Sequence, residues 1–370
     1  MKILLTHHRY HSNLFNWFRG FQANGHEVKL LVYKPDEVKE KGLPESVCLK
    51  PSRYSKWQMN RNQRTRGDGV DSFSPYYFPS FKELWKVFRQ NKPEVVIIRP
   101  AFTLFGYQTL LLALIFRAKI VFHSRIHIHR YYTPWKKYIF IVLMGVFGSY
   151  WMSPCNGDPK KYPNIPKRLV NLPFMIQAKF KSRDYFRGEQ INLLCVAKYF
   201  KSKNPLMMLE VFFELRKKHS GIRLTICGTG DELGEYYSNI KKLRHESGFS
   251  GDIDILINQP PSMMDQLYRS HDVFILPTNH DPASFTVLEA MSYGLSTITT
   301  DIDGSAGYIS RGENGYIVEK GNKDQLIGFL DHLIDNKELI KKQGEQSLRM
   351  VEKNHESKRH TSKFLKKILR

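Results

Sequence analysis

Residues 191–227 read INLLCVAKYFKSKNPLMMLEVFFELRKKHSGIRLTIC. The stretch begins with an apolar run, Ile191–Ala197, and passes through a lysine-rich turn. It continues as an amphipathic segment, Leu206–Lys218, and ends in a second apolar run, Ile222–Cys227. Two apolar runs of strand length joined by a segment of helix length are typical of a β-α-β unit with parallel strands. The stretch therefore predicts a parallel sheet that helices cover on both faces.

The same alternation of strand-like and helix-like segments continues along the chain. Strands are predicted at Ile3–Thr6, Val28–Tyr33, Val95–Ile98, Ile120–His123, Ile253–Ile257, Val273–Leu276 and Leu295–Thr299, and helices at Asn13–Asn24, Phe105–Arg117, Asp231–Glu246 and Phe285–Tyr293. A charged stretch between Pro173 and Gln190 interrupts the pattern. We therefore expect an α/β fold of two Rossmann-like, doubly wound domains, residues 1–175 and 176–350, which face a deep cleft.

Length and composition agree with two soluble domains. The chain has 370 residues, of which 41% are hydrophobic and 25% charged, and a chain of this length exceeds one ordinary core. The four cysteines are widely spaced, which argues against a disulfide framework or a structural zinc site and favours a reducing, cytoplasmic compartment. The short apolar run Ile3–Leu5 predicts no export signal.

Two uncharged stretches could be mistaken for membrane spans. Pro100–Phe116 and Tyr138–Gly157 both contain polar residues and glycine, whereas a spanning helix needs about 20 predominantly apolar residues. We interpret both stretches as buried helices that run into strands, and we expect a protein that lies on a membrane rather than crossing it.

The net charge is concentrated in the first half of the chain. The whole chain carries a formal charge of +22, and residues 1–180 hold 29 basic against 10 acidic side chains. Such asymmetry indicates a polyanionic partner, which could be nucleic acid, an anionic membrane surface or a phosphorylated acceptor. An excess that only keeps the protein soluble would not explain its confinement to one half.

One stretch between residues 53 and 66 combines basic and aromatic side chains. Its candidate contact residues for an acceptor or a membrane are Arg53, Lys56, Trp57, Arg61, Arg64 and Arg66. We expect a mobile, solvated surface loop, and its alternatives are contact with lipid headgroups or with nucleic acid.

The turn after Ile191–Ala197 is a candidate phosphate site. It contains Lys198, Lys201 and Lys203, and Asn204-Pro205 suits the N-cap and first position of the next helix. Lysine charges next to the amide groups of a helix N-terminus can hold a phosphate. A solvated lysine-rich loop is the alternative.

Two further segments follow predicted strands. Gly228-Thr229-Gly230 would let the backbone approach a ligand closely, although a plain turn has the same pattern. In Pro277–Gly294, Ser284 suits an N-cap, so that the amides of Phe285 and Thr286 would face an anion.

Two acids accompany this second segment. Asp281 precedes the predicted helix, and Glu289 lies within it among apolar residues. An acid there is costly unless hydrogen-bond donors reach it, and ribose hydroxyls would be such donors.

The order of these segments resembles the retaining glycosyltransferases of family 4, which have the GT-B fold. The matching residues are Lys198 and Lys203, Gly228-Thr229-Gly230, Asp281 with Glu289-Ala290-Met291-Ser292-Tyr293-Gly294, and Asn314-Gly315. The opening strand with Gly25-His26-Glu27-Val28 is similar to the start of that family. Asp281, Ser284 and Gly307 stand where Glu, Gly and Glu are usual, and the match runs from residue 1 to about residue 335.

The resemblance implies a role for each candidate residue. Lys198 and Lys203 would neutralise the donor diphosphate, and Glu289 would hold the ribose. Asp281 would orient the sugar with help from the amides near Phe285 and Thr286, and His123 would contact the transferred sugar. The family needs no metal cofactor, so we expect none at the clusters His7/His8/His11 and His123/His127/His129. Its last helix, here within residues 351–370, often returns to the first domain.

The resemblance favours transfer of a sugar from a nucleotide diphosphate to a lipid-linked, lipopolysaccharide or polysaccharide acceptor at the inner face of the cytoplasmic membrane. A nucleotide-sugar epimerase of the same architecture is the alternative, since fold does not fix function. A non-enzymatic nucleic-acid binder is a weaker alternative, because the chain has no recognisable nucleic-acid-binding signature. We therefore expect no nucleic-acid partner.

Overall fold

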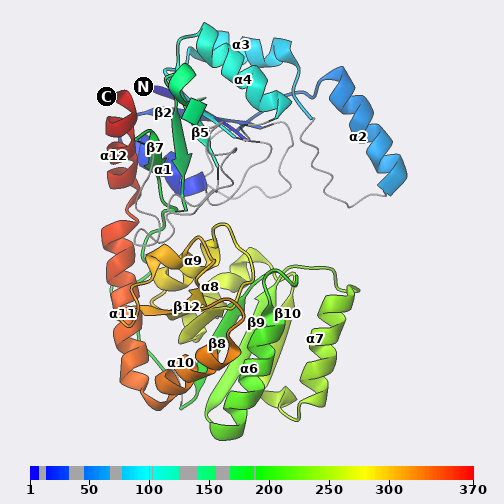
Figure 1. Ribbon diagram of the computed structural model, residues 1–370, viewed down its shortest axis with the longest axis vertical. Coiled ribbons are helices and arrows are strands. Elements are labelled where there is room, and N and C mark those ends of the chain that lie inside the picture. The colour runs from blue at the N-terminus through cyan, green and yellow to red at the C-terminus, as the bar shows by residue number, and fades with distance from the viewer. Residues whose placement is uncertain are drawn as a thin grey trace. The chain divides into compact units, whose positions relative to one another are not determined.

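The structure is a computed structural model that describes residues 1–7, 14–32, 46–66, 77–99, 101, 103–124, 141–142, 144–155, 167–186 and 189–370. The chain divides into two compact units. The first unit comprises Met1–Pro154, Lys161–Met175 and Ser357–Arg370, and the second comprises Cys155–Lys160 and Ile176–Glu356. Each unit contains its own parallel sheet (Figure 1).

The sheet of the first unit has, within the described residues, the strand order β3-β2-β1-β4-β5-β6-β7. These strands are β1 (Lys2–Thr6), β2 (Glu27–Val32), β3 (Ser46–Cys48), β4 (Val95–Ile98), β5 (Lys119–His123), β6 (Tyr150–Ser153) and β7 (Leu169–Asn171). All the paired strands run parallel. The central strand β4 is a buried run of β-branched residues, as expected of a sheet covered on both faces.

Helices of the first unit come from both ends of the sequence. In the described part of the chain they include α1 (Phe15–Ala23), α2 (Arg53–Arg66), α3 (Phe81–Asn91), α4 (Leu104–Ile115) and the C-terminal α12 (Ser357–Leu369). Helix α12 packs on α1, where the rings of Phe21 and Phe364 lie 6.2 Å apart and Asn24 donates to the Thr361 hydroxyl at 2.9 Å. A Cβ at Gly20 would lie 2.5 Å from the Ser357 carbonyl oxygen, so this close approach requires glycine.

The second unit has the strand order β10-β9-β8-β11-β12-β13 in the part of the chain that is described. Its strands are β8 (Ile191–Val196), β9 (Ile222–Gly228), β10 (Ile253–Ile257), β11 (Val273–Leu276), β12 (Ser296–Thr300) and β13 (Gly315–Val318). Its helices are α6 (Pro205–Lys218), α7 (Glu235–Glu246), α8 (Pro261–Ser270), α9 (Phe285–Ser292), α10 (Lys323–Asp335) and α11 (Lys337–Asn354).

The order of the strands reverses between β8 and β11. From β8 the chain moves outward to β9 and β10, and then returns across β8 to β11, β12 and β13. Ligands of doubly wound sheets bind beyond the carboxyl ends of the strands at such a reversal. A ligand site of this unit is therefore expected at the loops after β8 and β11.

The predicted α/β class and parallel sheets are confirmed, and the strand and helix predictions agree with the structure to within a few residues. The loop predicted at residues 53–66 is wrong, because these residues form α2. The helix forms because Ser52 caps its start: the Ser52 hydroxyl accepts a hydrogen bond from the Ser55 amide at 3.1 Å. No glycine or proline then follows before Gly67.

Among the described residues, no helix is both long enough and apolar enough to cross a bilayer. The predicted cleft between the domains stays a prediction.

Candidate functional site

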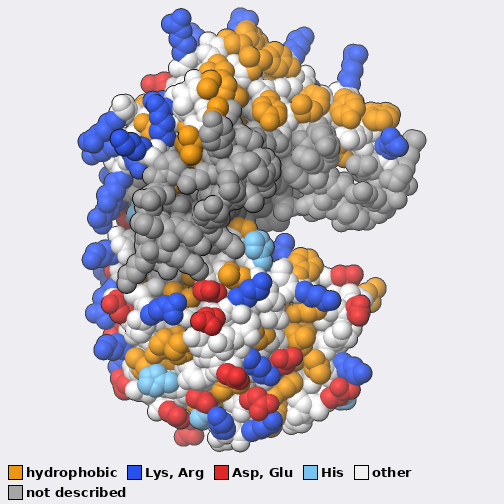
Figure 2. Space-filling view, viewed as in Figure 1, with side chains coloured by type: hydrophobic (Ala, Val, Ile, Leu, Met, Phe, Trp, Pro, Cys, Tyr) orange, Lys and Arg blue, Asp and Glu red, His pale blue; other side chains and the backbone are white. Residues whose placement is uncertain are grey.

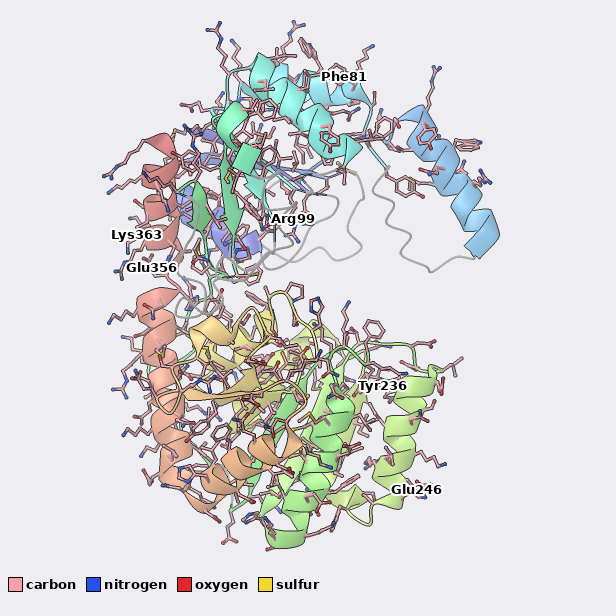
Figure 3. The ribbon with its side chains drawn as sticks, viewed as in Figure 1. Phe81, Arg99, Tyr236, Glu246, Glu356 and Lys363 are labelled. Carbon is pink, nitrogen blue, oxygen red and sulfur yellow. The ribbon has the colours of Figure 1, made fainter. Side chains whose placement is uncertain are left out.

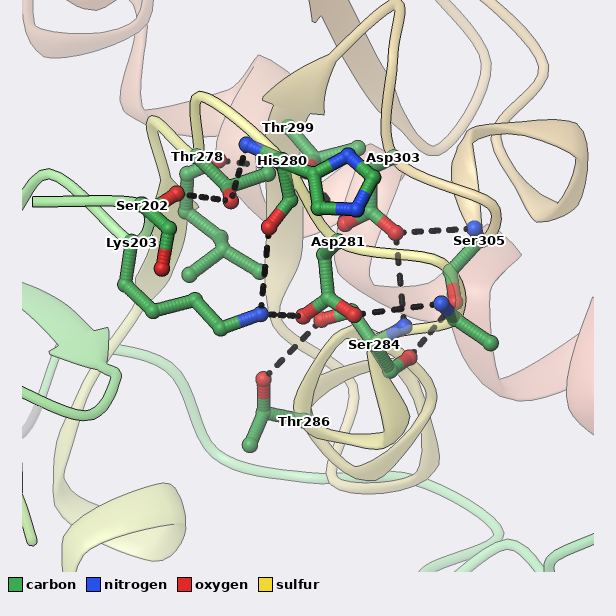
Figure 4. Close-up of polar contacts among 12 residues, drawn as sticks. Ser202, Lys203, Thr278, His280, Asp281, Ser284, Thr286, Thr299, Asp303 and Ser305 are labelled. Atoms are coloured by element: carbon green, nitrogen blue, oxygen red, sulfur yellow. Dashed lines mark hydrogen bonds and ion pairs between the residues drawn. The ribbon is translucent and has the colours of Figure 1, made fainter. Parts of the chain in front are cut away.

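The loops that follow β8 and β11 are joined by hydrogen bonds to one carbonyl group. The Ser202 carbonyl accepts from the Asn279 amide at 2.8 Å, the His280 amide at 3.0 Å and the Thr278 hydroxyl at 2.8 Å. Figure 4 shows the contact of the Thr278 hydroxyl with this carbonyl in the close-up. Three donors thus converge on one carbonyl, more than its two lone pairs. They hold the loop after β11 against the loop after β8.

An ion pair adds to this junction. The Lys203 Nζ lies 2.5 Å from Asp281 Oδ2, and both side chains are largely buried. The other oxygen of Asp281, Oδ1, accepts from the Ala283 amide at 3.1 Å (Figure 4). The structure thus brings together two of the predicted catalytic residues, whereas Lys198 is exposed at the start of the same loop.

A third acid, which the sequence analysis missed, lies beneath Asp281. Asp303 is 1% exposed, and its backbone pairs with that of Asp281 in a short parallel bridge. Its carboxylate accepts from the Ser305 amide at 2.9 Å, the Ser284 amide at 3.4 Å and the Thr299 hydroxyl at 2.8 Å. Asp303 therefore fixes the loop that carries Asp281 and Ser284.

Burial governs the protonation of this third acid. Burial first, and the charge of Asp281 second, raise the pKa of Asp303 from 3.8 to about 7, although the three donors favour the ionised form. A folded-state pKa above the unfolded one means that the folded protein binds more protons between these values. Folding stability from this group is therefore largest at low pH and is lost as the pH rises from about 4 to about 7.

We expect Asp303→Asn to remove this pH dependence, because asparagine keeps an acceptor oxygen and carries no charge. The melting temperature of the variant, compared with that of the parent, should rise steadily between pH 4 and pH 7. Burial lowers the pKa of His271 to about 4, so the stability that depends on this group rises with pH. His271 is present in both proteins, and its effect therefore cancels in the comparison. A difference in melting temperature that stays constant with pH would contradict the assignment.

Glu289 lies on α9 and is held by an aromatic pair. The Tyr268 hydroxyl donates to Glu289 Oε2 at 3.1 Å, and the rings of Tyr268 and Tyr293 stack at 5.1 Å. Burial, and then the charge of Glu289, raise the pKa of Tyr268, so the hydroxyl stays a donor. Tyr293 is in turn held by Asp265, to which it donates at 2.7 Å. This network positions a carboxylate at the surface of a largely apolar helix.

The predicted capping positions are correct, but neither side chain caps its helix. Asn204 precedes α6 in the left-handed conformation, with φ of 53°, and its amide group contacts the Met207 sulfur instead. Ser284 precedes α9, and its hydroxyl contacts that of Thr286 at 3.4 Å. Its carbonyl accepts from Ser305 at 2.6 Å, so the start of α9 is fixed from outside the helix. Phe285 and Thr286 form the first turn of α9 and are half-buried.

The Gly228-Thr229-Gly230 segment is shaped by contacts within the protein. A Cβ at Gly228 would lie 1.7 Å from the Ala197 carbonyl oxygen, and one at Gly230 would lie 3.1 Å from Tyr199 Cβ. The Asn258 side chain bonds both backbone groups of Gly230, at 3.1 and 3.2 Å. Gly228 is therefore required by the backbone of Ala197, which leads into the loop that carries Lys198 and Lys203.

We expect Gly228→Ala to destabilise the protein strongly, since backbone would have to move to admit the new methyl group, and Gly230→Ala to have a milder effect. Thermal unfolding of the two variants measures the difference. Equal and small effects would show that the close approach of Gly228 to Ala197 is not a structural requirement.

The remaining predicted residues lie in the first unit. His123 ends β5, is 2% exposed and packs edge-on against Trp17 with ring centroids 5.0 Å apart. Arg53, Lys56, Trp57 and Arg61 are exposed on α2, which also includes positions 64 and 66. His8, His11, His127 and His129 lie outside the described residues. In the described parts of the chain, no group of three or more His, Cys, Asp or Glu side chains is arranged to hold a metal ion.

Residues 177–350 match the family model described as glycosyl transferases group 1. An uncharacterized glycosyltransferase of Haemophilus influenzae is 29% identical over 167 residues, which are 44% of this chain and 45% of that protein. The lipopolysaccharide core biosynthesis glycosyltransferase LpsE of Rhizobium meliloti is 24% identical over 137 residues, 37% of this chain and 36% of that protein. The chain thus spans less than half the length of these two relatives.

Solved structures match over the whole chain. A glycosyltransferase from Rickettsia africae superposes with a TM-score of 0.76 at 15% identity, and the match covers 100% of this chain and 98% of that one. HepE of Anabaena, in complex with UDP, gives 0.73 at 10% identity and covers 99% of each chain. The lipopolysaccharide outer core galactosyltransferase WaaB gives 0.67 at 14% identity, with 100% and 99% covered. The predicted glycosyltransferase resemblance and GT-B fold are confirmed.

Proposed function

We propose that this chain, in which residues 177–350 carry the glycosyl transferases group 1 pattern, is a retaining glycosyltransferase. It moves a sugar from a nucleotide diphosphate donor to a lipid-linked, lipopolysaccharide or polysaccharide acceptor. The observation that carries this proposal is the Lys203–Asp281 pair at the point where the strand order reverses, with Glu289 on the helix that follows the same loop.

Each charged group at this junction has a part in the proposed reaction. Lys203 and Lys198 hold the diphosphate, whose negative charge grows as the glycosidic bond breaks. Asp281, fixed by the Ala283 amide, orients the sugar, and Glu289 accepts hydrogen bonds from the ribose hydroxyls. The amides of Phe285 and Thr286 at the start of α9 add fixed positive dipoles. The sugar contact of His123 stays a prediction.

No dedicated base and no metal cofactor are needed in this mechanism. The acceptor hydroxyl attacks the anomeric carbon on the face from which the nucleotide leaves, so the configuration is retained. A β-phosphate oxygen of the departing nucleoside diphosphate takes the proton of the acceptor hydroxyl. The protein holds the reactants in position and stabilises the charge of the leaving group.

The names of similar proteins support the donor and acceptor classes. HepE was crystallised with UDP and with UDP-glucose, which supports a nucleotide-sugar donor. LpsE and WaaB are named for lipopolysaccharide core biosynthesis and outer core galactosyl transfer, which supports an acceptor of the bacterial envelope. Such acceptors favour action at the inner face of the cytoplasmic membrane.

Product analysis distinguishes the transferase from the alternative epimerase. The protein is incubated with UDP-, GDP- and ADP-sugars, with and without lipid-linked glycan acceptors, and the products are identified by mass spectrometry. We expect one donor to yield a free nucleoside diphosphate and a glycosylated acceptor. A new nucleotide-sugar isomer, formed without any acceptor, would identify an epimerase instead.

A further inference from the structure

Helix α4 is apolar on both of its sides. Its sequence, LFGYQTLLLALI, has no charged residue, and its inner side packs through Phe105 and Leu112 into the core of the first unit. A helix that is hydrophobic all round is ordinarily buried all round. The uncharged stretch Pro100–Phe116 accordingly predicts a buried helix here.

The outer side of α4 is nevertheless exposed. Tyr107, Leu111, Leu114 and Ile115 lie on one side of the helix, and between 41% and 53% of each is exposed. The prediction of a buried helix is therefore wrong for this side. Apolar side chains that form a continuous exposed surface usually mark an interaction site.

Helix α3 extends this surface. It packs beside α4 and exposes Phe81 and Trp85, whose rings lie 6.3 Å apart, and the Trp85 ring meets Phe116 at the end of α4 at 5.6 Å. Figure 3 labels Phe81 near the start of α3, and Figure 2 shows apolar side chains gathered over α3 and α4. We call this surface the α3–α4 face. It consists of Phe81, Trp85, Tyr107, Leu111, Leu114 and Ile115.

The surroundings of the α3–α4 face are basic. Lys82, Lys86 and Arg89 are exposed on α3 itself, and the exposed Arg117 follows α4. Over the described residues 77–99 and 103–124, the sequence has seven Lys and Arg side chains against two Glu. A surface of aromatic and aliphatic side chains with a basic border is complementary to the boundary of an anionic bilayer.

Helix α2 presents a second surface of the same composition. The Ser55 hydroxyl, which accepts from the Phe78 amide at 2.9 Å, attaches it to the segment that leads into α3. Tyr54 and Trp57 are exposed on α2, and the Arg61 guanidinium lies over the Trp57 ring at 5.6 Å. Aromatic rings and arginines are the side chains that favour the headgroup region of a membrane.

We propose that the α3–α4 face docks on an anionic lipid bilayer, with its apolar side chains at the acyl boundary and its lysines and arginines among the headgroups. A second copy of the chain fits less well, because two positive borders would repel each other. The surface belongs to the first unit, whereas Lys203, Asp281 and Glu289 belong to the second. Failure of this proposal would therefore remove the support for action at the membrane, but it would leave the proposed sugar transfer at Lys203, Asp281 and Glu289 standing.

Vesicle cosedimentation tests the proposal with the full chain. Phosphatidylcholine vesicles, with and without phosphatidylglycerol, are mixed with the protein at low and at high salt. We expect the protein to bind only the anionic vesicles, and this binding to fall steeply with salt.

Leu111→Gln with Ile115→Gln should weaken binding to the anionic vesicles at least about ten-fold by removing apolar contact. Lys82→Gln with Lys86→Gln should weaken it roughly ten- to thirty-fold, since each lysine near an anionic surface contributes about 1 kcal/mol.

Matched controls separate this surface from general charge and hydrophobicity. Lys341→Gln with Lys342→Gln removes two exposed charges from α11, and Leu233→Gln with Leu369→Gln removes two exposed leucines outside the α3–α4 face. Both controls should bind like the parent, and melting temperatures check that every variant is folded.

Three outcomes would overturn the proposal: equal binding to neutral vesicles, no binding to anionic vesicles, or equal losses of binding in the control variants. Sedimentation equilibrium without lipid would show a dimer sensitive to Leu111→Gln if the partner were a second copy, which would also overturn it.

Discussion

Glu289→Ala is expected to weaken binding of the donor nucleotide about 10- to 150-fold while leaving the protein folded. The carboxylate is predicted to accept hydrogen bonds from the ribose, and loss of a hydrogen bond to a charged group costs about 1.5–3 kcal/mol. Its side chain is only half-buried, so the alanine leaves no cavity in the core. Titration calorimetry with UDP, GDP and ADP measures the change in affinity.

Two further variants show whether this effect belongs to the site. Glu246→Ala removes an exposed carboxylate at the end of α7, labelled in Figure 3, and should bind nucleotide like the parent. Tyr268→Phe removes the hydroxyl that positions Glu289 and should weaken binding less than Glu289→Ala does. Parent-like affinity in Glu289→Ala would refute the assignment of Glu289 to the ribose.

Lys203→Ala is expected to lower kcat by about 10²–10³, with a smaller change in KM, because the charge that it neutralises grows in the transition state. The variant also leaves Asp281 beside the buried Asp303 without its cation. Lys198→Ala should have a smaller effect, since Lys198 is exposed and makes no ion pair with Asp281. Steady-state kinetics with the identified donor separate kcat from KM.

The partner of Lys203 gives an internal control. Asp281→Glu keeps the negative charge, and Asp281→Asn removes it while keeping the size of the side chain. We expect the glutamate variant to retain far more activity than the asparagine variant. Equal losses would mean that geometry rather than charge governs this position, and a change in KM alone for Lys203→Ala would make it a binding residue.

The sheet of the second unit could be predicted because its strands are short, buried apolar runs separated by helix-length segments. Strands β10 and β11 have the predicted bounds, β8 and β9 differ by one residue at the carboxyl end, and β12 is shifted by one residue at both ends. The resemblance placed Asp281, Lys203 and Glu289 at one donor site, and parallel strands put the loops that follow them at one edge of the sheet. The Lys203–Asp281 contact agrees with that argument.

Other features depend on tertiary contacts that the sequence does not display. Asp303 occurs in a short polar segment, and only the fold shows that it is buried and joined to Ser284 and Ser305. Gly228 has the pattern of a ligand-binding glycine, but its neighbour is the carbonyl of Ala197. The exposed side of α4 could not be predicted either, since an apolar sequence does not show which of its sides lacks a protein partner.

Helix α2 is different, because the sequence did contain its signal. Ser52 precedes a stretch of fourteen residues without glycine or proline, and its hydroxyl accepts the Ser55 amide. The arginines of that stretch are also typical of a solvated loop, which is why a loop was predicted. Intrinsic helix propensity, which is high for arginine, lysine and glutamine, favoured the helix throughout.

Proton NMR of the reacting sugar tests the proposed chemistry most directly. The parent and Lys203→Ala are each incubated with the donor that binds, and the anomeric signals are followed from the first turnover. We predict that the parent releases the nucleoside diphosphate and that the first sugar product has the anomeric configuration of the donor. Lys203→Ala should do the same about 10²–10³ times more slowly. A product of inverted configuration, or an unchanged rate in Lys203→Ala, would contradict a retaining transfer supported by the loop that follows β8.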